Sequence, residues 1–533
     1  MSKRSQSTDL AGIRDTVESI WVAIVLAFVL RAFLVEGFVI PTGSMAPRLM
    51  GEHWQLQCSG CGYEYAYGFQ QELPGQARIN RAVQQTPAGA RCPNCGRLYN
   101  EGAEPIDGGD RVLVLKYLYN FRPPQPWDVV VFRNPQNNRE NYIKRLVGLP
   151  GETLEIVHGD LFVAPGPQGP WSIRRKPARA QQAMWQVVYD NDYVPTDAAR
   201  RARWAADQEA FWQVQANGRS LTYLGGSSQT QWLRLLAPPQ GFLPHYGYNA
   251  EQVQDRWVNP ALDVCTDLKL LASFTPLDAA SQIGLHLTSF EHRFRGLLSA
   301  SGQASLLYQR ADWPEQRWEV LAQTSTAPIP IGRSVEAALE NVDQALRLRV
   351  NGRCVLEVLD RYPMDYPSLK RRLASGAVPV PEARIAAAGG RARLTHLRVY
   401  RDVYYSNVAL DPVPGGPLGD YARSLGLEQS GPGWGTTGHP ITLAKFPGQP
   451  DLDQFWVLGD NSPQSLDGRA WTSAAPTLRL RDASGRPAYQ LGAVPRYSLT
   501  GRAFFVYWPS GMRPPGLPNL PLIPDVGRMR LIR

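Results

Sequence analysis

The sequence predicts a mainly β protein behind one N-terminal membrane-spanning helix. The 533 residues include 45 prolines and 48 glycines, which favour turn-rich β structure over long helices. Short runs of β-branched and apolar residues, bounded by Pro and Gly, recur along the chain. The only long apolar run stands near the N-terminus. The net charge of +9 is scattered without a Lys/Arg patch, so we expect no nucleic-acid partner.

The N-terminal apolar run covers residues 20–35, with Arg31 inside it, and 38–40 extends it. It is slightly short for a membrane span of roughly 20 residues. The alternative is a cleaved secretory signal, but no small-residue cleavage site separates the run from Ser44. Basic residues before the run favour a cytoplasmic N-terminus. We therefore expect a cytoplasmic tail (1–17), an anchor (18–40) and an extracytoplasmic remainder.

Runs typical of strands occur in three separate parts of the chain. Together they predict one antiparallel β domain assembled from segments 41–57, 105–165 and 440–510. The predicted strands are residues 111–117, 128–132, 455–458 and 503–507.

Two insertions separate these segments, at 58–104 and 166–439. In the larger one, 265–405 predicts a β-sandwich, because Asn351-Gly352 joins two alternating strands in a hairpin. The pattern is similar to jelly rolls of the concanavalin or laminin-G type. Such an insertion is tolerable if its ends meet, near Pro165 and His439. A short helix is expected near 198–211, and the Pro-rich tail, 511–533, is expected to be extended.

Two short motifs carry the chemistry. Ser44 stands in Ile-Pro-Thr-Gly-Ser-Met-Ala-Pro (40–47), and Lys144 in Tyr-Ile-Lys-Arg-Leu-Val-Gly-Leu-Pro-Gly-Glu (142–152). A hydroxyl is a poor nucleophile at neutral pH, and a lysine can activate it only if apolar burial lowers the lysine pKa. A loop serine and a solvated lysine beside Arg145 are the alternatives.

These motifs, together with Leu-Gly-Asp-Asn-Ser-Pro-Gln-Ser-Leu-Asp-Gly-Arg (458–469), resemble the bacterial type I signal peptidases. The resemblance covers the anchor and about 36–57, 107–165 and 440–510, but not the middle of the chain. It implies a signal-peptidase-type antiparallel β catalytic domain. It also implies a membrane-bound serine endopeptidase that removes signal peptides from exported preproteins after small residues, at the outer face of the bacterial cytoplasmic membrane. Signal peptides and membrane lipid would be its partners, and catalysis would need no cofactor.

The same resemblance assigns individual roles. Ser44 would be the nucleophile and Lys144 its base, while the Ser44 amide and the hydroxyl of Thr42, a serine in many relatives, would form the oxyanion hole. Ser465 would hydrogen-bond the lysine and orient it. An ordinary Gly-Asp-Asn turn is the alternative for Asp460 and Asn461. The other expected supporting residues are Asp467 and Arg469 from the same motif, Arg145, whose charge would depress the lysine pKa, and Met45, which would line a substrate pocket.

Six cysteines form a further pattern. Cys58 and Cys61, and Cys92 and Cys95, stand in two Cys-x-x-Cys-Gly motifs, which are typical of the knuckles of a structural zinc ribbon. Disulfides are the alternative, because thiols outside the cytoplasm tend to oxidise. The sequence leaves open whether the other two, Cys265 and Cys354, are buried thiols or a bridge.

The tryptophan-rich part of the large insertion suggests a glycan or protein ligand, with core packing as the alternative. Two other functions remain open for the chain as a whole. One is a catalytically idle relative that serves as a membrane-anchored binding module. The other is a peptidase with a narrow substrate set.

Overall fold

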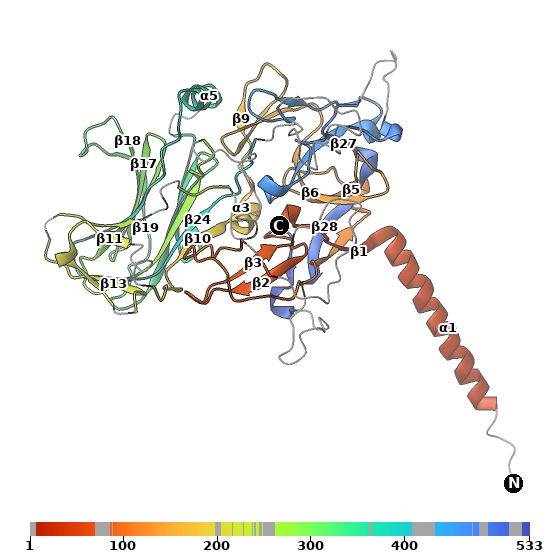
Figure 1. The fold of residues 1–533 in the computed structure, drawn as a ribbon, viewed down its shortest axis with the longest axis horizontal. Helices are drawn as coiled ribbons and strands as arrows, with labels where there is room; N and C mark the ends of the chain where they lie inside the picture. The colour runs from red at the N-terminus through yellow and green to blue at the C-terminus, as the bar shows by residue number, and fades with distance from the viewer. Residues whose placement is uncertain are drawn as a thin grey trace, which may run out of the picture.

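The described residues form five β-sheets in a computed structural model (Figure 1). The expected Pro-rich tail is described only from residue 525 onward, and the expected 198–211 helix only from residue 204 onward. The structure describes residues 7–69, 86–87, 89–197, 204–215, 217–227, 229–236, 238, 241–244, 248, 262–361, 365–407, 432–471, 473–478, 489–510 and 525–533.

The first sheet is named the catalytic sheet because it contains the strands predicted for the expected catalytic domain. It has eight antiparallel strands from both ends of the chain, in the order β1-β4-β28-β5-β6-β26-β27, with β29 beside β28. All four strands predicted in the flanking segments belong to it. Most apolar side chains of these strands are buried, at alternating positions in β4 and at consecutive positions in β5 and β26. The bounds are β1 (Val35–Val39), β4 (Arg111–Leu115), β5 (Val129–Arg133), β6 (Asn141–Gly148), β26 (Gln454–Leu458), β27 (Ala493–Pro495), β28 (Leu499–Trp508) and β29 (Arg530–Leu531).

A small sheet in the order β25-β7-β8-β9 connects the catalytic sheet to the large insertion. Ala164, at the end of β8, and Thr442, in β25, are both register partners of Thr153 in β7. The ends of the insertion therefore meet, as expected. The bounds are β7 (Thr153–Val157), β8 (Asp160–Ala164), β9 (Ser172–Ile173), β25 (Ile441–Thr442) and the neighbouring helix α3 (Ala178–Met184).

The large insertion contains a two-sheet sandwich that is longer than the predicted 265–405. One sheet has the order β12-β13-β24-β15-β20-β21-β22, with β10 beside β24, and the other β11-β14-β23-β16-β17-β18-β19. Five strands between residues 186 and 235 complete these sheets, so the sandwich begins at β10. The bounds are β10 (Gln186–Asp190), β11 (Trp204–Ala206), β12 (Trp212–Val214), β13 (Ser220–Tyr223), β14 (Gln231–Leu235), β15 (Leu268–Pro276), β16 (Gln282–Ser289), β17 (His292–Ser299), β18 (Gln303–Arg310), β19 (Glu319–Ser325), β20 (Val335–Val342), β21 (Ala345–Val350), β22 (Arg353–Leu359), β23 (Ala383–Ala388) and β24 (Ala392–Arg401).

The predicted Asn351-Gly352 hairpin is confirmed. Both residues have positive φ angles, 49° and 75°, which the tight two-residue turn requires. The expected 198–211 helix is wrong over its described part. Residues 204–206 are strand β11, and only one 3-10 turn, Glu209–Phe211, follows.

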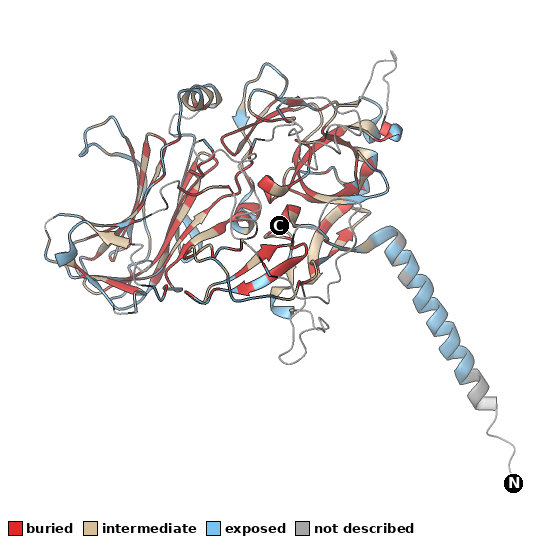
Figure 2. Cartoon of the chain, viewed as in Figure 1, coloured by how far each residue is buried: buried red, intermediate tan, exposed pale blue. Residues whose placement is uncertain are grey.

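The inner faces of the two sandwich sheets form the largest core of the molecule, visible as the buried strands in Figure 2. Tryptophans divide between two environments. Trp212 is buried in this core, whereas Trp232 and Trp318 are half-buried on either side of the Arg295 guanidinium. Two further helices, α2 (Leu118–Phe121) and α5 (Tyr366–Ala374), are short.

The N-terminal helix α1 (Ser7–Val29) projects away from the rest of the molecule and continues as a π-helical turn, Leu30–Leu34 (Figure 1). The expected 18–40 anchor is wrong at its end, because Val35–Val39 is β1 and pairs with β4 in the catalytic sheet. Among the described residues we find no helix whose length and apolar character suit it to cross a membrane.

A hairpin joins β2 (His53–Gln57), at the end of the predicted 41–57 segment, to β3 (Glu64–Gly68), at the start of the first insertion, and lies between the catalytic sheet and the sandwich (Figure 1). The last residues of the chain return to the catalytic sheet, where β29 pairs with β28. Within the described part of the expected extended tail, Arg530–Leu531 are extended as a strand, whereas Val526–Arg528 form a 3-10 turn.

Candidate functional site

Ser44 lies in a single 3-10 turn, Gly43–Met45, between β1 and the β2–β3 hairpin. Its side chain is nearly buried, and the Met45 side chain is fully buried beneath the turn. Gly43 is required by close packing. A Cβ there would lie 2.4 Å from the ring of Tyr248, so any larger residue would push the serine turn out of place.

Lys144, on β6, is placed against this turn from the neighbouring part of the sheet. Its Nζ lies 2.6 Å from the Ser44 Oγ, to which it donates a hydrogen bond. The lysine is 4% exposed. Burial lowers its pKa to about 8, although Asp467 and Asp460 oppose that shift. The two residues thus form a hydrogen-bonded pair in which the amine loses its proton far more readily than an exposed lysine does.

Arg145 does not depress the lysine pKa in the expected way. Successive side chains on a strand point to opposite faces, so Arg145 turns away from Lys144. Its guanidinium donates two hydrogen bonds to Asp460, of 2.7 and 2.6 Å, and both side chains are buried. Arg469, not Arg145, is the cation that helps to lower the pKa of Lys144.

The loop after β26 holds the serine turn from the other side. The Asn461 amide N–H donates to the Ser44 carbonyl oxygen (3.0 Å), and its side-chain Nδ2 donates to the Gly43 carbonyl (2.9 Å). The Asp460 amide lies 3.5 Å from the Met45 sulfur. Asp460 and Asn461 are therefore direct braces of the turn and not an ordinary loop, which the local sequence could not reveal.

Asp467 and Arg469 form a second buried ion pair behind Lys144. The arginine donates to both carboxylate oxygens, at 2.9 and 2.8 Å, and Asp467 also accepts from the Gly459 amide. Arg469 further donates to the Ser462 side chain and to the Ser406 carbonyl, which comes from the large insertion. This pair fixes both ends of the loop that braces Ser44.

One expected role, the bond from Ser465 to Lys144, is not reproduced in the geometry. Ser465 is buried, but its Oγ finds no partner among the described residues and makes no bond to Lys144. The Oγ points toward Gly459, where an added Cβ would lie only 2.1 Å away. Thr42 directly precedes the serine turn and is exposed, and its hydroxyl does not cap that turn.

The large insertion supplies braces that no sequence motif indicated. Tyr248 packs on Gly43 and on Gly68, its carbonyl accepts from the Gly68 amide (2.6 Å), and its hydroxyl donates to the Glu52 carbonyl (3.2 Å). Arg48, four residues after the serine, donates to the Trp185 carbonyl (2.7 Å). The serine turn is thus packed against a residue of the insertion.

The four cysteines of the two knuckles converge in one cluster, with all four sulfur atoms within 4.8 Å of one another. The nearest sulfur pairs are 3.6 and 3.7 Å apart, too far for disulfide bonds of about 2.05 Å. In each knuckle the glycine after the second cysteine has a positive φ, and its amide donates to the carbonyl of the first cysteine. No disulfide forms among the six cysteines, and Cys265 is buried while Cys354 is exposed. The four are Cys58, Cys61, Cys92 and Cys95.

Comparison with known proteins adds a family likeness. Residues 103–204 match the family described as "Signal peptidase, peptidase S26". The match includes Lys144 and Arg145 but stops short of Ser44.

Curated relatives are similar over part of their length. Signal peptidase I of Rickettsia bellii (strain OSU 85-389) is 24% identical over 163 residues, 31% of this chain and 44% of the relative. Signal peptidase I of Leptolyngbya laminosa is 32% identical over 100 residues, 16% of this chain and 49% of the relative. The chain spans about half the length of the curated relatives it matches.

Among solved structures, the carbohydrate binding module CBM66 from Bacillus subtilis aligns with 37% of this chain and 93% of its own. The identity is 10% and the TM-score 0.24, so the likeness supports no conclusion about this chain.

The buried Arg145–Asp460 pair generates a stability prediction. Asp460→Asn leaves a buried guanidinium without its counter-charge, so we expect the free energy of unfolding to fall by about 3–5 kcal/mol. Denaturant unfolding of the full chain in detergent, followed by tryptophan fluorescence, measures it. Asp451→Asn, at an exposed position, is the matched control. Equal stabilities of the two variants would contradict the assigned importance of the pair.

Proposed function

We propose that the chain is a serine endopeptidase that uses Ser44 and Lys144 to remove signal peptides from exported preproteins. The observation that carries the proposal is the 2.6 Å contact between the serine hydroxyl and a buried lysine of lowered pKa. The family likeness of residues 103–204 and of the curated relatives supports the substrate class.

In the proposed reaction, neutral Lys144 accepts the Ser44 proton as the hydroxyl oxygen attacks the peptide carbonyl. The bond to the leaving amine then breaks, and the lysine returns the proton to that amine. Water, activated by the same lysine, hydrolyses the resulting ester. The Ser44 amide and the Thr42 hydroxyl would stabilise the oxyanion, and the exposed position of Thr42 next to the serine turn is compatible with this role.

The substrate would bind as an extended strand. β26 pairs with β6 only from Arg145 onward, so residues 141–144 lie in the ladder with β5 alone among the described strands. The edge of β6 at Ile143 and Lys144, just beyond the end of the β26 ladder, suits a peptide that adds to the sheet. Phe38, Met45 and Ile143 pack together beside it. A site lined by such bulky side chains leaves room for small substrate residues before the cut.

We further propose that α1 and the following π-helical turn attach the chain to the cytoplasmic membrane of a bacterium, with the β domains on the extracytoplasmic side. Support comes from apolar side chains that the fold leaves exposed. Trp21, Val22 and Phe28 are 62%, 66% and 66% exposed, so no part of the chain that the structure describes buries them. An apolar helix surface of this kind is stabilised by lipid.

The cysteine cluster fits a structural zinc ion, which we propose as its ligand. Four sulfurs at 2.3 Å from a tetrahedral zinc lie about 3.8 Å apart, close to the observed 3.6 and 3.7 Å. Four thiolates leave no open coordination position. The ion would stiffen the hairpin of β2 and β3, and the proposed reaction does not need it.

The zinc proposal predicts one zinc per purified chain by elemental mass spectrometry. Cys92→Ser should lose most of it, because a closed site needs all four thiolates, whereas Cys354→Ser should keep it. The thiol count of the denatured, unreduced protein provides a second readout. Six titratable thiols agree with zinc, and two or four would show disulfides instead.

The catalytic proposal predicts that Ser44→Ala and Lys144→Ala each lower kcat/KM on a preprotein by roughly 10³-fold or more, because each removes one member of a pair that acts as a unit. Cleavage in detergent by the full chain measures it. Ser301→Ala and Lys445→Ala, at exposed positions, are matched controls. Equal cutting by all forms would point to a different active site, and cutting by none would favour a binding module.

The lowered lysine pKa predicts the direction of the pH dependence. Below its pKa the ammonium group cannot accept the serine proton, so kcat/KM should rise with pH through a midpoint near the pKa of about 8. Initial rates measured from about pH 6 to 9 test it, with thermal stability recorded at each pH as the control. A rate that is flat or falls across this range while the fold persists would exclude Lys144 as the base.

A further inference from the structure

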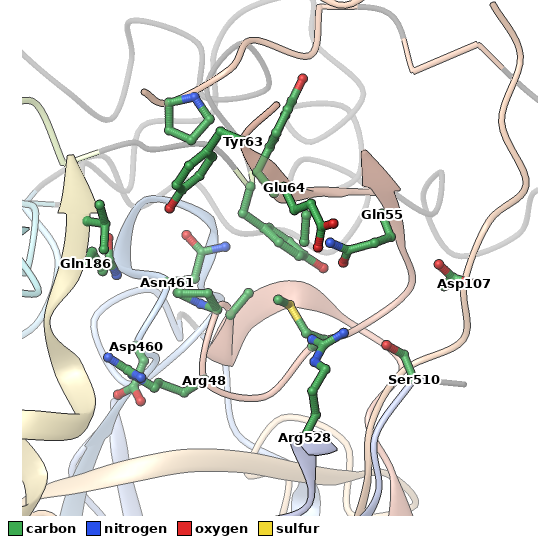
Figure 3. A pocket seen from close by; sticks show the side chains of 18 of the residues that line it. Arg48, Gln55, Tyr63, Glu64, Asp107, Gln186, Asp460, Asn461, Ser510 and Arg528 are labelled. Atoms are coloured by element: carbon green, nitrogen blue, oxygen red, sulfur yellow. The ribbon is translucent and has the colours of Figure 1, made fainter. Parts of the chain in front are cut away.

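A cavity of about 710 Å³ lies beside the serine turn, between three parts of the chain. Ala46 and Pro47 come from the residues just after the serine turn. Strand β3 of the β2–β3 hairpin contributes Glu64, and β10 of the sandwich contributes Gln186. Figure 3 shows Gln186 on one side of this space and Glu64 on the other. Its volume is within the range of ligand-binding pockets.

The cavity begins at the residues that hold Ser44. Asn461, which donates to the Ser44 and Gly43 carbonyls, lines the wall together with Asp460 (Figure 3). Ala46 and Pro47 come two and three residues after the serine in the chain. A polypeptide bound at Ser44 therefore needs only a few residues, at about 3.3 Å each when extended, to enter the cavity.

Two strands in the cavity wall are edge strands, each hydrogen-bonded to a neighbouring described strand on one side only. Among the described strands, β3 pairs only with β2, and β10 pairs only with β24. Glu64–Ala66 and Gln186–Val187, which line the cavity, belong to these strands. Free strand edges bind extended polypeptide through backbone hydrogen bonds, largely irrespective of side chains.

The side chains of the wall add a charge preference. Five carboxylates and three guanidinium groups line the cavity, and one of the carboxylates, Asp460, is paired with Arg145, so the other lining groups carry one more negative than positive charge. A segment without acidic residues suits this wall better than an acidic one. The carboxylates are Glu64, Glu104, Asp107, Asp460 and Asp525, and the guanidinium groups belong to Arg48, Arg401 and Arg528.

The direction of the substrate follows from the position of α1. This helix leaves the molecule on the side opposite the sandwich (Figure 1). A signal peptide held in the same membrane as α1 approaches Ser44 from that side, so the chain beyond the cut bond must continue toward the sandwich. We propose that the cavity binds this segment, the first residues of the mature protein, as an extended, non-acidic polypeptide. The inference rests on the proposed peptidase function.

The test uses the full chain in detergent and two preproteins with the same signal peptide and cut site. One ends two residues after the cut, and the other continues for ten residues. We expect kcat/KM to be about tenfold higher for the long substrate. Glutamates in place of neutral residues at the third to sixth positions after the cut should remove most of that gain, and lysines should not.

Ala66→Trp fills the cavity from β3 and should reduce the ratio of the long-substrate to the short-substrate kcat/KM to about one. Ala374→Trp, the same change at an exposed position of α5, should keep the ratio of the unaltered chain. An undiminished ratio in Ala66→Trp would overturn the proposal. If the unaltered chain cuts neither substrate, the proposed peptidase function is contradicted. If it cuts both equally well, only the proposed role of the cavity is contradicted.

A second measurement covers the case that Ala66→Trp does not fold. Ser44→Ala binds the long preprotein without cutting it, and a photo-crosslinker placed at the fifth residue after the cut site reports its surroundings. Crosslinks to the peptides that contain β3 and β10 are expected. Crosslinks elsewhere would show that the segment leaves by another route.

Discussion

The site depends on lowering the pKa of a lysine that lies among carboxylates. Asp467 and Asp460 both raise the pKa of Lys144, while burial lowers it to about 8. Each carboxylate is tied to an arginine of its own, Arg469 or Arg145, in a buried two-bond pair. Because these ion pairs neutralise the carboxylates locally, burial prevails at the lysine. The same pairs hold the loop that contacts the serine turn. The two ion pairs therefore both lower the effect of the carboxylates on the Lys144 pKa and fix the position of Ser44.

This arrangement brings together residues from distant parts of the sequence. Asn461 contacts Ser44 across more than four hundred residues, with most of the sandwich between them. The entropic cost of such a closure grows only with the logarithm of loop length. It is reduced further because Ala164 and Thr442 flank the same residue of β7, so the sandwich joins the catalytic sheet through two adjacent connections.

Local patterns predicted much of the fold, and tertiary contacts account for what they missed. Four strands of the catalytic sheet and the Asn351-Gly352 hairpin follow from alternation and turn chemistry within a few residues, whereas β1 was expected to belong to the anchor. The first strands of the sandwich escaped because β11 and β12 have three residues each, too few for a period to be recognised. Ser44 and Lys144 stand in distinctive motifs. The orientation of Arg145 and the packing of Tyr248 on Gly43 depend on partners that no local pattern specifies.

The position of Tyr248 changes how the large insertion is understood. An inserted module that merely decorated a catalytic domain would contact it only near its two connections. Here its residues reach the serine turn itself, through Tyr248 on Gly43, and the brace behind the lysine, through the Ser406 carbonyl bound by Arg469. Loss of the insertion would remove both contacts and so loosen the Ser44 turn even with the Ser44 and Lys144 motifs intact, which makes the insertion a structural part of the site.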